Sequence, residues 1–281
     1  MRRSLLFIPA NSPAMLQNAD IFETDGLIFD LEDAISLMEK DAARDLLSAY
    51  FETYKLEGVE LIIRMNQLDS IYADDDLKRA LSWPIDSIMV PKARYQDLVQ
   101  LEVKLEKLEK KTKREKKIML IPIIEQAIAL FEVDKIASLD RVSALLLGGE
   151  DLATNLEVER TKDAEEILLA RQLVIYAAKA YSKDAIDTPF TDVSDKEGLI
   201  QDAKHAKRLG MSGKSCIHPI QIDDINTIFS PTEKEIAYAH RVIEAEKEAL
   251  LNHKGVFSVD GKMVDKPIIE RAKKLLEKVK S

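Results

Sequence analysis

The sequence is poor in the features that mark secreted and membrane-spanning proteins. Its 281 residues include one cysteine, Cys216, which cannot form an internal disulfide and therefore indicates a reducing, cytoplasmic location. The apolar run near the N-terminus stops at Pro9, so it is shorter than the ~7–15 apolar residues of a signal peptide. No run approaches the ~20 apolar residues of a transmembrane helix, and we expect no membrane partner.

Positive charge is also scarce. The chain has 41 lysines and arginines against 50 acidic residues, which gives a formal net charge of −9 at pH 7 and a pI of about 5.2. Because nucleic-acid phosphates select for clustered basic charge, this balance argues against nucleic acid as a partner. The segment 97–117, which is basic between residues 104 and 117, is interpreted as a solvated outer helix, because Leu98, Leu101 and Leu105 recur in it at helical spacing. The alternative is a docking surface for an acidic partner.

Eight short apolar runs alternate with segments of helical periodicity. Most are apolar throughout, as expected for strands buried on both faces; they span residues 4–9, 26–33, 60–66, 87–92, 118–125, 144–151, 185–190 and 213–219. This alternation predicts an α/β fold, a (β/α)8 TIM barrel, and no glycine-rich loop opens the first helix as in a dinucleotide-binding sheet. We expect the barrel to be a catalytic domain over residues 1–225. Residues 226–281 would form a C-terminal extension of helices and a hairpin turning at Asp260-Gly261, with a role between subunits.

Polar residues gather where the predicted strands end. The carboxyl ends of parallel barrel strands meet at one face, where barrel enzymes build their sites. The residues at these ends are Asp30, Glu32, Asp33, Arg64, Lys92, Glu125, Glu150 and Asp151. We therefore expect a catalytic site assembled from the second to the sixth strand.

Glu125 and Asp151 follow consecutive predicted strands, so they should be neighbours in the barrel. Two converging carboxylates make a hard oxygen site suited to Mg²⁺, with water and substrate as the other ligands. Gly148 and Gly149 would let the backbone approach a ligand closely. The alternative is that both acids cap the helices that follow them.

Arg64 ends a buried strand, where a cation needs an anionic partner. Its planar fork suits a substrate carboxylate, and the alternative is an internal ion pair with an acid of the preceding strand. Those acids, Asp30, Glu32 and Asp33, could orient Arg64, hold a metal-bound water or act as the base. Lys92 raises a competing chemistry, a metal-free aldolase that forms a Schiff base, against which stands an ordinary surface lysine.

Several longer motifs occur in order along the chain: RRSLLFIPAN (2–11), LIFDLEDAISLMEKDAAR (27–44), LIIRMNQLDS (61–70), LLLGGEDLATNLEVERT (145–161), GKSCIHPIQID (213–223) and GKMVDKP (261–267). Together they resemble the citrate lyase β subunit family, within the HpcH/HpaI aldolase and citrate lyase superfamily. The resemblance covers nearly the whole chain, and NLEVERT followed by EEILLAR is similar to the β subunits themselves. Two segments depart from the β-subunit pattern, Pro9-Ala10-Asn11 and SCIHP, the latter resembling stand-alone enzymes.

The resemblance implies a barrel of the pyruvate/phosphoenolpyruvate type that forms a homotrimer or a trimer-based oligomer. It implies Mg²⁺ on Glu125 and Asp151, with Arg64 gripping the oxo-acid part of the substrate and the backbone around Gly149–Asp151, which includes Glu150, binding the same carboxylate. It also implies Lys40 in a thioester-facing segment, Asp33 or Asp265 as the base, and Asp265 reaching a neighbouring subunit. Asp30 and Glu32, from their place at the strand end, are further candidates for binding the substrate.

The implied reaction is the retro-aldol cleavage of a citryl thioester into oxaloacetate and an acetyl thioester. The thioester would be carried by an acyl carrier (γ) subunit and supplied with the help of a transferase (α) subunit. The alternatives are a stand-alone lyase for citramalyl-CoA or malyl-CoA, which would share the catalytic residues, a non-catalytic assembly subunit, and the aldolase built on Lys92.

Overall fold

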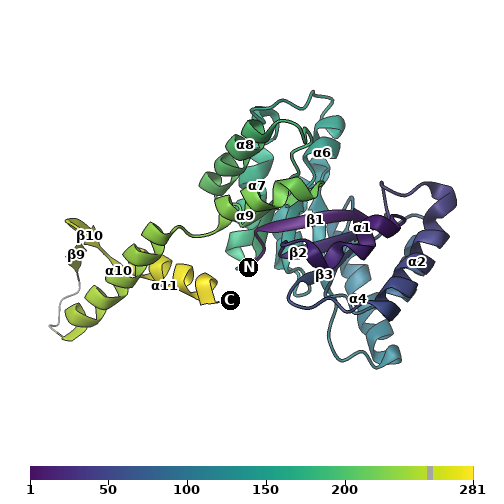
Figure 1. Cartoon of the computed structure of the whole chain (residues 1–281), viewed down its shortest axis with the longest axis horizontal. Helices are drawn as coiled ribbons and strands as arrows, with labels where there is room; N and C mark the ends of the chain where they lie inside the picture. The colour runs from purple at the N-terminus through teal and green to yellow at the C-terminus, as the bar shows by residue number, and fades with distance from the viewer. Residues whose placement is uncertain (252–255, 281) are drawn as a thin grey trace. The chain divides into compact units, whose positions relative to one another are not determined.

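Each of the eight apolar runs coincides with or overlaps a strand in the computed structural model, which describes residues 1–251 and 256–280. The strands are parallel and close into one barrel (Figure 1): β1 (Ser4–Pro9), β2 (Gly26–Asp30), β3 (Glu60–Arg64), β4 (Ser87–Val90), β5 (Met119–Ile124), β6 (Ala144–Leu147), β7 (Asp184–Asp187) and β8 (Gly213–Cys216). Pairing of β1 with β8 completes the ring, with Leu5 opposite Ser215. The predicted (β/α)8 barrel is therefore confirmed.

Helices follow the strands and cover the outside of the barrel. They are α1 (Pro13–Gln17), α2 (Lys40–Thr53), α3 (Ala73–Ala80), α4 (Tyr95–Thr112), α5 (Ala127–Ser138), α6 (Gly149–Asn155), α7 (Leu168–Ala180), α8 (Lys196–Leu209) and α9 (Ile222–Phe229). Short 3-10 turns precede three of them, η2 (Leu37–Glu39), η3 (Glu165–Ile167) and η4 (Pro219–Gln221), and η1 (Ala19–Ile21) follows α1. In α4 the leucines at 98, 101 and 105 face the core, as the helical spacing predicted.

The strands are apolar on both faces because each face meets a different core. Leu5, Ile28 and Ile62 point into the barrel with a small interior cluster. Leu6 and Leu27, which alternate with them, pack in the larger layer between the strands and the surrounding helices. The register then fixes which strand ends are neighbours, because Asp30 lies opposite Arg64 and Ile124 lies opposite Leu147.

The chain divides into two compact units, the barrel Arg2–Phe229 and a second unit that begins at Ser230. This division follows the end of α9, whereas the sequence places it after residue 225. The second unit contains α10 (Glu233–Leu251), the hairpin β9 (Phe257–Val259) and β10 (Lys262–Val264), and α11 (Lys266–Lys280). Its own apolar cluster includes Val242, Val259 and Val264.

The hairpin of the second unit turns where the sequence predicts. Asp260 and Gly261 both have positive φ, 51° and 76°. A two-residue turn with this backbone matches the right-handed twist of the two strands that it connects. Glycine takes this conformation without strain, and aspartate is among the residues that tolerate it. In the described part of the chain, no helix combines the length and the apolar character needed to cross a membrane.

Candidate active site

A cavity of about 460 Å³ opens at the carboxyl ends of the barrel strands. Its lining brings together most of the residues that the sequence singled out: Asp30, Asp33, Arg64, Glu125, Gly149, Glu150 and Asp151. These residues come from the ends of four strands that are far apart in the sequence and form two adjacent pairs in the barrel, β2 with β3 and β5 with β6. The convergence is the first requirement for a shared chemical role.

Arg64 is the cation of this cavity, and it is held by the acids of the neighbouring strand end. Its Nε and Nη2 donate to the two carboxylate oxygens of Asp30 at 2.7 and 2.6 Å, while Nη1 lies 3.2 Å from Glu32 and 3.4 Å from Asp33. Burial lowers the pKa of Arg64, but the hydrogen bonds and charge of Asp30 outweigh it and leave the pKa raised. The internal ion pair therefore exists, and Arg64 still faces the cavity.

Asp30 is built as a support for Arg64. Besides the arginine, its two oxygens accept the backbone N–H groups of Glu32 at 2.9 Å and Ala34 at 3.1 Å. A buried carboxylate with this many donors is held rigidly, so it fixes the direction of the guanidinium. Asp33 is different, because its side chain is largely exposed and has only a long contact with Arg64.

The side chains of Glu32 and Lys40 face the protein interior at the connection between β2 and α2. Burial raises the pKa of Glu32 to about 7, against the opposing charge of Arg64. The Lys40 ammonium donates to the carbonyl oxygens of Leu31 and Glu32, both at 2.7 Å, and does not line the cavity. Lys40 thus fastens the loop that carries the acids, and its thioester-facing role stays a prediction.

Glu125 is buried at the end of β5, with 4% of its surface exposed. Its Oε1 accepts the backbone N–H of Lys92 at 2.5 Å, and Lys92 adopts a left-handed backbone with φ of 46°. Burial, assisted by the negative charge of Asp151, raises the pKa of Glu125 to about 8. The α5 N-terminus is served by Asn155, which accepts from Ala127, so Glu125 is not needed as its cap.

The turn after β6 is shaped around the Glu125 carboxylate. A Cβ placed on Gly148 would lie 2.6 Å from the Glu125 Cβ and 2.7 Å from its Oε2, so only glycine leaves room there. Asp151 follows in the first turn of α6, exposed, and makes no hydrogen bond or ion pair among the described residues. Two carboxylates thus face one cavity.

This donor set fits a hard divalent cation. No group of three or more histidine, cysteine or acidic side chains is placed to hold a metal in the described ranges. Glu125 and Asp151 would therefore share the ion with water and substrate oxygens, which is the coordination that Mg²⁺ prefers. The raised pKa of Glu125 supports the same interpretation, because burial outweighs the stabilising charge of Arg64 on the carboxylate.

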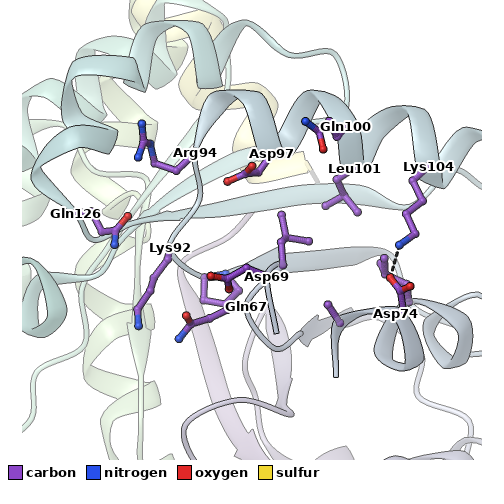
Figure 2. A pocket seen from close by; sticks show the side chains of 14 residues that line it. Gln67, Asp69, Asp74, Lys92, Arg94, Asp97, Gln100, Leu101, Lys104 and Gln126 are labelled. Atoms are coloured by element: carbon purple, nitrogen blue, oxygen red, sulfur yellow. Dashed lines mark hydrogen bonds and ion pairs between the residues drawn. The ribbon is translucent and has the colours of Figure 1, made fainter. Parts of the chain in front are cut away.

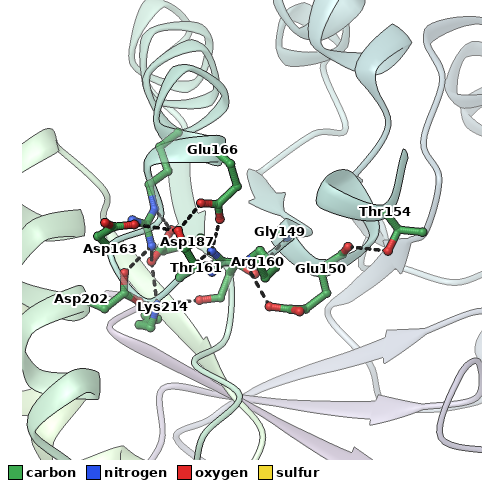
Figure 3. Close-up of polar contacts among 12 residues, drawn as sticks. Gly149, Glu150, Thr154, Arg160, Thr161, Asp163, Glu166, Asp187, Asp202 and Lys214 are labelled. Carbon is green, nitrogen blue, oxygen red and sulfur yellow. Dashed lines mark hydrogen bonds and ion pairs between the residues drawn. The ribbon is translucent and has the colours of Figure 1, made fainter. Parts of the chain in front are cut away.

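Gly149 and Glu150 have partners of their own. The Gly149 N–H donates to the Thr188 hydroxyl at 2.9 Å, and a Glu150 oxygen accepts from Arg160 at 3.1 Å (Figure 3). Gly149 must be glycine, because a Cβ there would lie 2.9 Å from the Thr188 oxygen. The binding of a substrate carboxylate by Gly149 and Glu150 stays a prediction.

Thr188, which the sequence analysis missed, is fixed by a cluster of buried charges at β7 and β8 (Figure 3). Lys214 donates to the Thr188 carbonyl at 2.6 Å and to Asp187 and Asp202 at 2.7 and 2.6 Å. Arg171 binds both aspartates at 2.6 to 3.0 Å. The charged letters inside the runs DAID and GKSC were the available signal for this cluster.

The remaining candidates within the barrel are not part of this cavity's lining. The Lys92 side chain lines a neighbouring cavity of about 560 Å³ beside α3 and α4, together with Gln67 and Arg94 (Figure 2). Cys216 is buried and its thiol pKa is raised to about 12, as expected of a structural residue. Asp265 belongs to the second unit, where its Oδ1 accepts from the Ile268 N–H at 3.4 Å at the start of α11.

Comparison with known proteins gives a consistent picture. The family described as HpcH/HpaI aldolase/citrate lyase matches residues 3–219. The chain is 37% identical to citrate lyase subunit beta of Haemophilus influenzae, covering 100% of this chain and 98% of the relative. It is 38% identical to the same subunit of Leuconostoc mesenteroides, over 99% and 93%. It is 30% identical to the mitochondrial citramalyl-CoA lyase of Rattus norvegicus, over 98% and 85%.

Two solved structures from Mycobacterium tuberculosis add the ligands of such folds. CitE in complex with magnesium, acetoacetate and coenzyme A has a TM-score of 0.80 at 26% identity, covering 99% of this chain and 98% of that one. A citrate lyase beta subunit complexed with oxaloacetate and magnesium has a TM-score of 0.69 at 26% identity, over 81% and 96%. The strand-end cavity, the family match and the full-length relatives agree: the chain belongs to the HpcH/HpaI aldolase/citrate lyase family and is a carbon–carbon lyase.

Proposed function

We propose that this protein is a Mg²⁺-dependent citryl-thioester lyase that acts as the beta subunit of a citrate lyase. The observation that carries the proposal is the convergence of Arg64, Glu125 and Asp151 on one cavity at the barrel mouth. The substrate is inferred from the relatives named citrate lyase subunit beta and from the structure with oxaloacetate and magnesium. The reaction would release oxaloacetate and leave an acetyl thioester.

Glu125 and Asp151 would hold the Mg²⁺ ion. When bound, such an ion offsets negative charge and lowers the pKa of a hydroxyl group beside it. The protein's part is to place these two carboxylates on adjacent strand ends, with Gly148 leaving space for Glu125.

Arg64 would bind and orient the oxo-acid carboxylate. Its guanidinium is fixed by Asp30, so it needs no reorganisation when charge builds up on the forming product. A base takes the proton of the tertiary hydroxyl, the carbon–carbon bond breaks, and its electron pair moves into the thioester carbonyl to give an enolate. Protonation of that enolate then gives the acetyl thioester. Asp33, exposed at the cavity, is our proposed base within the barrel, and Asp265 of a neighbouring copy is the alternative.

The proposed partners follow from the same relatives. We infer a citrate lyase complex in which the citryl group is carried on an acyl carrier subunit and a transferase subunit loads it. We further propose a trimer or trimer-based oligomer and a cytoplasmic location. The second candidate function is a stand-alone lyase for citramalyl-CoA or malyl-CoA, supported by the citramalyl-CoA lyase relative at 30% identity.

The test is release of oxaloacetate from citryl-CoA, a soluble substitute for the citryl carrier. It should be run with Mg²⁺ and with EDTA, for the wild type, Glu125→Gln and Asp151→Asn. We expect Mg²⁺-dependent cleavage that falls at least about 100-fold in each variant. Cleavage that resists EDTA would reject the metal site and favour the Schiff-base alternative at Lys92. Preferred cleavage of citramalyl-CoA would favour the second candidate.

A further inference from the structure

The proposed substrate poses a charge problem at the barrel mouth. The oxaloacetate half of a citryl thioester has two carboxylates, whereas the corresponding half of a citramalyl thioester has one carboxylate and a methyl group. Among the described residues that line the 460 Å³ cavity, Arg64 is the one cation, and its donors already face Asp30, Glu32 and Asp33. A second carboxylate therefore needs a second cation at the edge of this cavity.

We propose that Arg160 is the specificity-determining residue that binds this second carboxylate. The inference rests on the proposed function and names the feature of the substrate that this site selects. Arg160 lines a hollow of about 210 Å³ that shares Glu150 and Thr191 with the main cavity, so the two spaces adjoin. Figure 3 shows the Arg160 guanidinium beside Glu150, in the first turn of α6.

The donors of Arg160 are used unevenly. Nη1 is bound on the inner side by Glu166 and by the Thr161 carbonyl, the latter at 3.1 Å. Nε has a single bond of 3.1 Å to Glu150, and Nη2 makes no hydrogen bond within the described residues. Because Nε and Nη2 form one edge of the guanidinium, this edge can take a carboxylate through two parallel bonds. Arg64 uses the same edge to bind Asp30.

The two acids around Arg160 differ in how firmly they hold it. The Glu166 side chain is 11% exposed and also accepts from the Thr161 hydroxyl, so it anchors the arginine. The Glu150 side chain is 48% exposed, so its carboxylate can turn into water at little cost. A substrate carboxylate can therefore replace Glu150 on the open edge while Glu166 keeps the guanidinium in place.

The expected consequence is selection by charge. With Arg160 present, a substrate bearing the extra CH₂–COO⁻ group gains a charge-assisted pair, whereas a methyl group in the same place leaves the open edge unpaired. Loss of the guanidinium should weaken recognition of the second carboxylate about 10–100-fold. Recognition of the carboxylate shared by both substrates should stay unchanged, because it belongs to Arg64.

The experiment compares two product acids as well as two substrates. Binding of oxaloacetate and of pyruvate to the Mg²⁺-loaded protein is measured by calorimetry, and kcat/KM is measured for citryl-CoA and citramalyl-CoA. We expect Arg160→Gln to weaken oxaloacetate binding about 10–100-fold and to leave pyruvate binding within about twofold. Equal loss for both acids, or no loss for oxaloacetate, would overturn the assignment.

Matched control variants distinguish a loss of substrate recognition from a folding defect and from a general change in charge. Lys162→Gln removes one positive charge from the same loop and the same hollow, where Lys162 is paired with Asp195 at 2.6 Å, and it should change neither acid's affinity. A loss of oxaloacetate binding in Lys162→Gln equal to that in Arg160→Gln would attribute the effect to the overall field and reject the proposal.

Arg160→Gln also leaves Glu166 without its cation, so the double variant Arg160→Gln/Glu166→Gln is included. It should fold like the wild type in thermal unfolding and still lose oxaloacetate selectivity; a double variant that regains the selectivity would reject a direct role for Arg160. Failure of the proposed function would look different. In that case the wild type itself would neither cleave citryl-CoA nor bind oxaloacetate in preference to pyruvate.

Discussion

Glu125 is the residue in which burial and function conflict most clearly. Its carboxyl is buried beside Asp151, and burial raises its pKa to about 8. At neutral pH the metal-free protein therefore keeps a proton on Glu125, and a cation must displace that proton to bind. We expect the Mg²⁺ affinity to rise by up to about tenfold per pH unit between pH 6 and 8 and to level off above.

A Mn²⁺ or Mg²⁺ titration at fixed ionic strength from pH 6 to 9 measures this dependence. Glu125→Gln is the control, because glutamine keeps an oxygen for the Lys92 N–H but has no proton to lose. Its affinity should be low and independent of pH. A wild-type affinity that stays flat across this range would show that Glu125 is not the titrating ligand.

At Glu125, a substitution that should abolish activity is also expected to increase the stability of the metal-free protein. An acid whose pKa is higher in the folded than in the unfolded state loses stabilising free energy as pH rises from the unfolded value, 4.5, to the folded value of about 8. Glu125→Gln removes this loss. We expect the metal-free variant to be more stable than the metal-free wild type at pH 8 by at least about 1 kcal/mol. Denaturant unfolding at pH 4.5 and 8 tests it, since the difference should be small at the lower pH.

Residue types and positions at strand ends were sufficient to predict most of the cavity lining. Arg64, Glu125 and Asp151 converge because a parallel barrel brings the carboxyl ends of its strands together, whatever lies between them. The direction in which a side chain points could not be predicted from the sequence in the same way. Lys40 turns back to its own loop, and Thr188 has no charge to mark it, so neither position could be assigned from a pattern.

At the scale of elements, the apolar runs predicted the strands well, and two runs that contain charged residues have a physical explanation. The run 185–190 contains Asp187, and the run 213–219 contains Lys214, so neither matches a fully apolar strand. In the fold both charges are buried together with Arg171 and Asp202, joining β7, β8, α7 and α8. Hydrophobic periodicity does not predict a strand whose polar residues are paired with partners distant in the sequence.

This cluster should dominate the stability of its half of the barrel. Lys214→Met would leave Asp187 and Asp202 sharing Arg171 alone in a region closed to water. We expect the free energy of unfolding to fall by about 3–5 kcal/mol, measured by urea denaturation. Lys110→Met is the matched control, because Lys110 forms an exposed pair with Glu106 on α4 and should change stability by less than about 0.5 kcal/mol. A small effect at Lys214 would mean that the aspartates rearrange or take up protons.

At the scale of the whole molecule, the sequence predicted a barrel followed by a hairpin-bearing extension, and both are present. The hairpin could be predicted because the Asp-Gly turn is a local signal, and the unit around it has its own apolar cluster. If Asp265 works in a neighbouring copy, as the resemblance implies, its position is set by surfaces on separate copies of the chain. Hydrophobic periodicity within one copy does not encode such an arrangement.

If Asp265 completes the active site of a neighbouring copy, two inactive variants should restore each other. Arg64→Ala damages the barrel site, and Asp265→Ala damages the contributed residue, so a functional site can form where an intact barrel meets an intact neighbour. Random assortment in a ring predicts about a quarter of wild-type activity for equal co-expression, against nearly none for either variant alone. Oxaloacetate release by the co-purified mixture measures it. A mixture as inactive as its parts would place Asp265 in its own subunit's site, whereas an active Asp265→Ala variant would place Asp265 outside the chemistry.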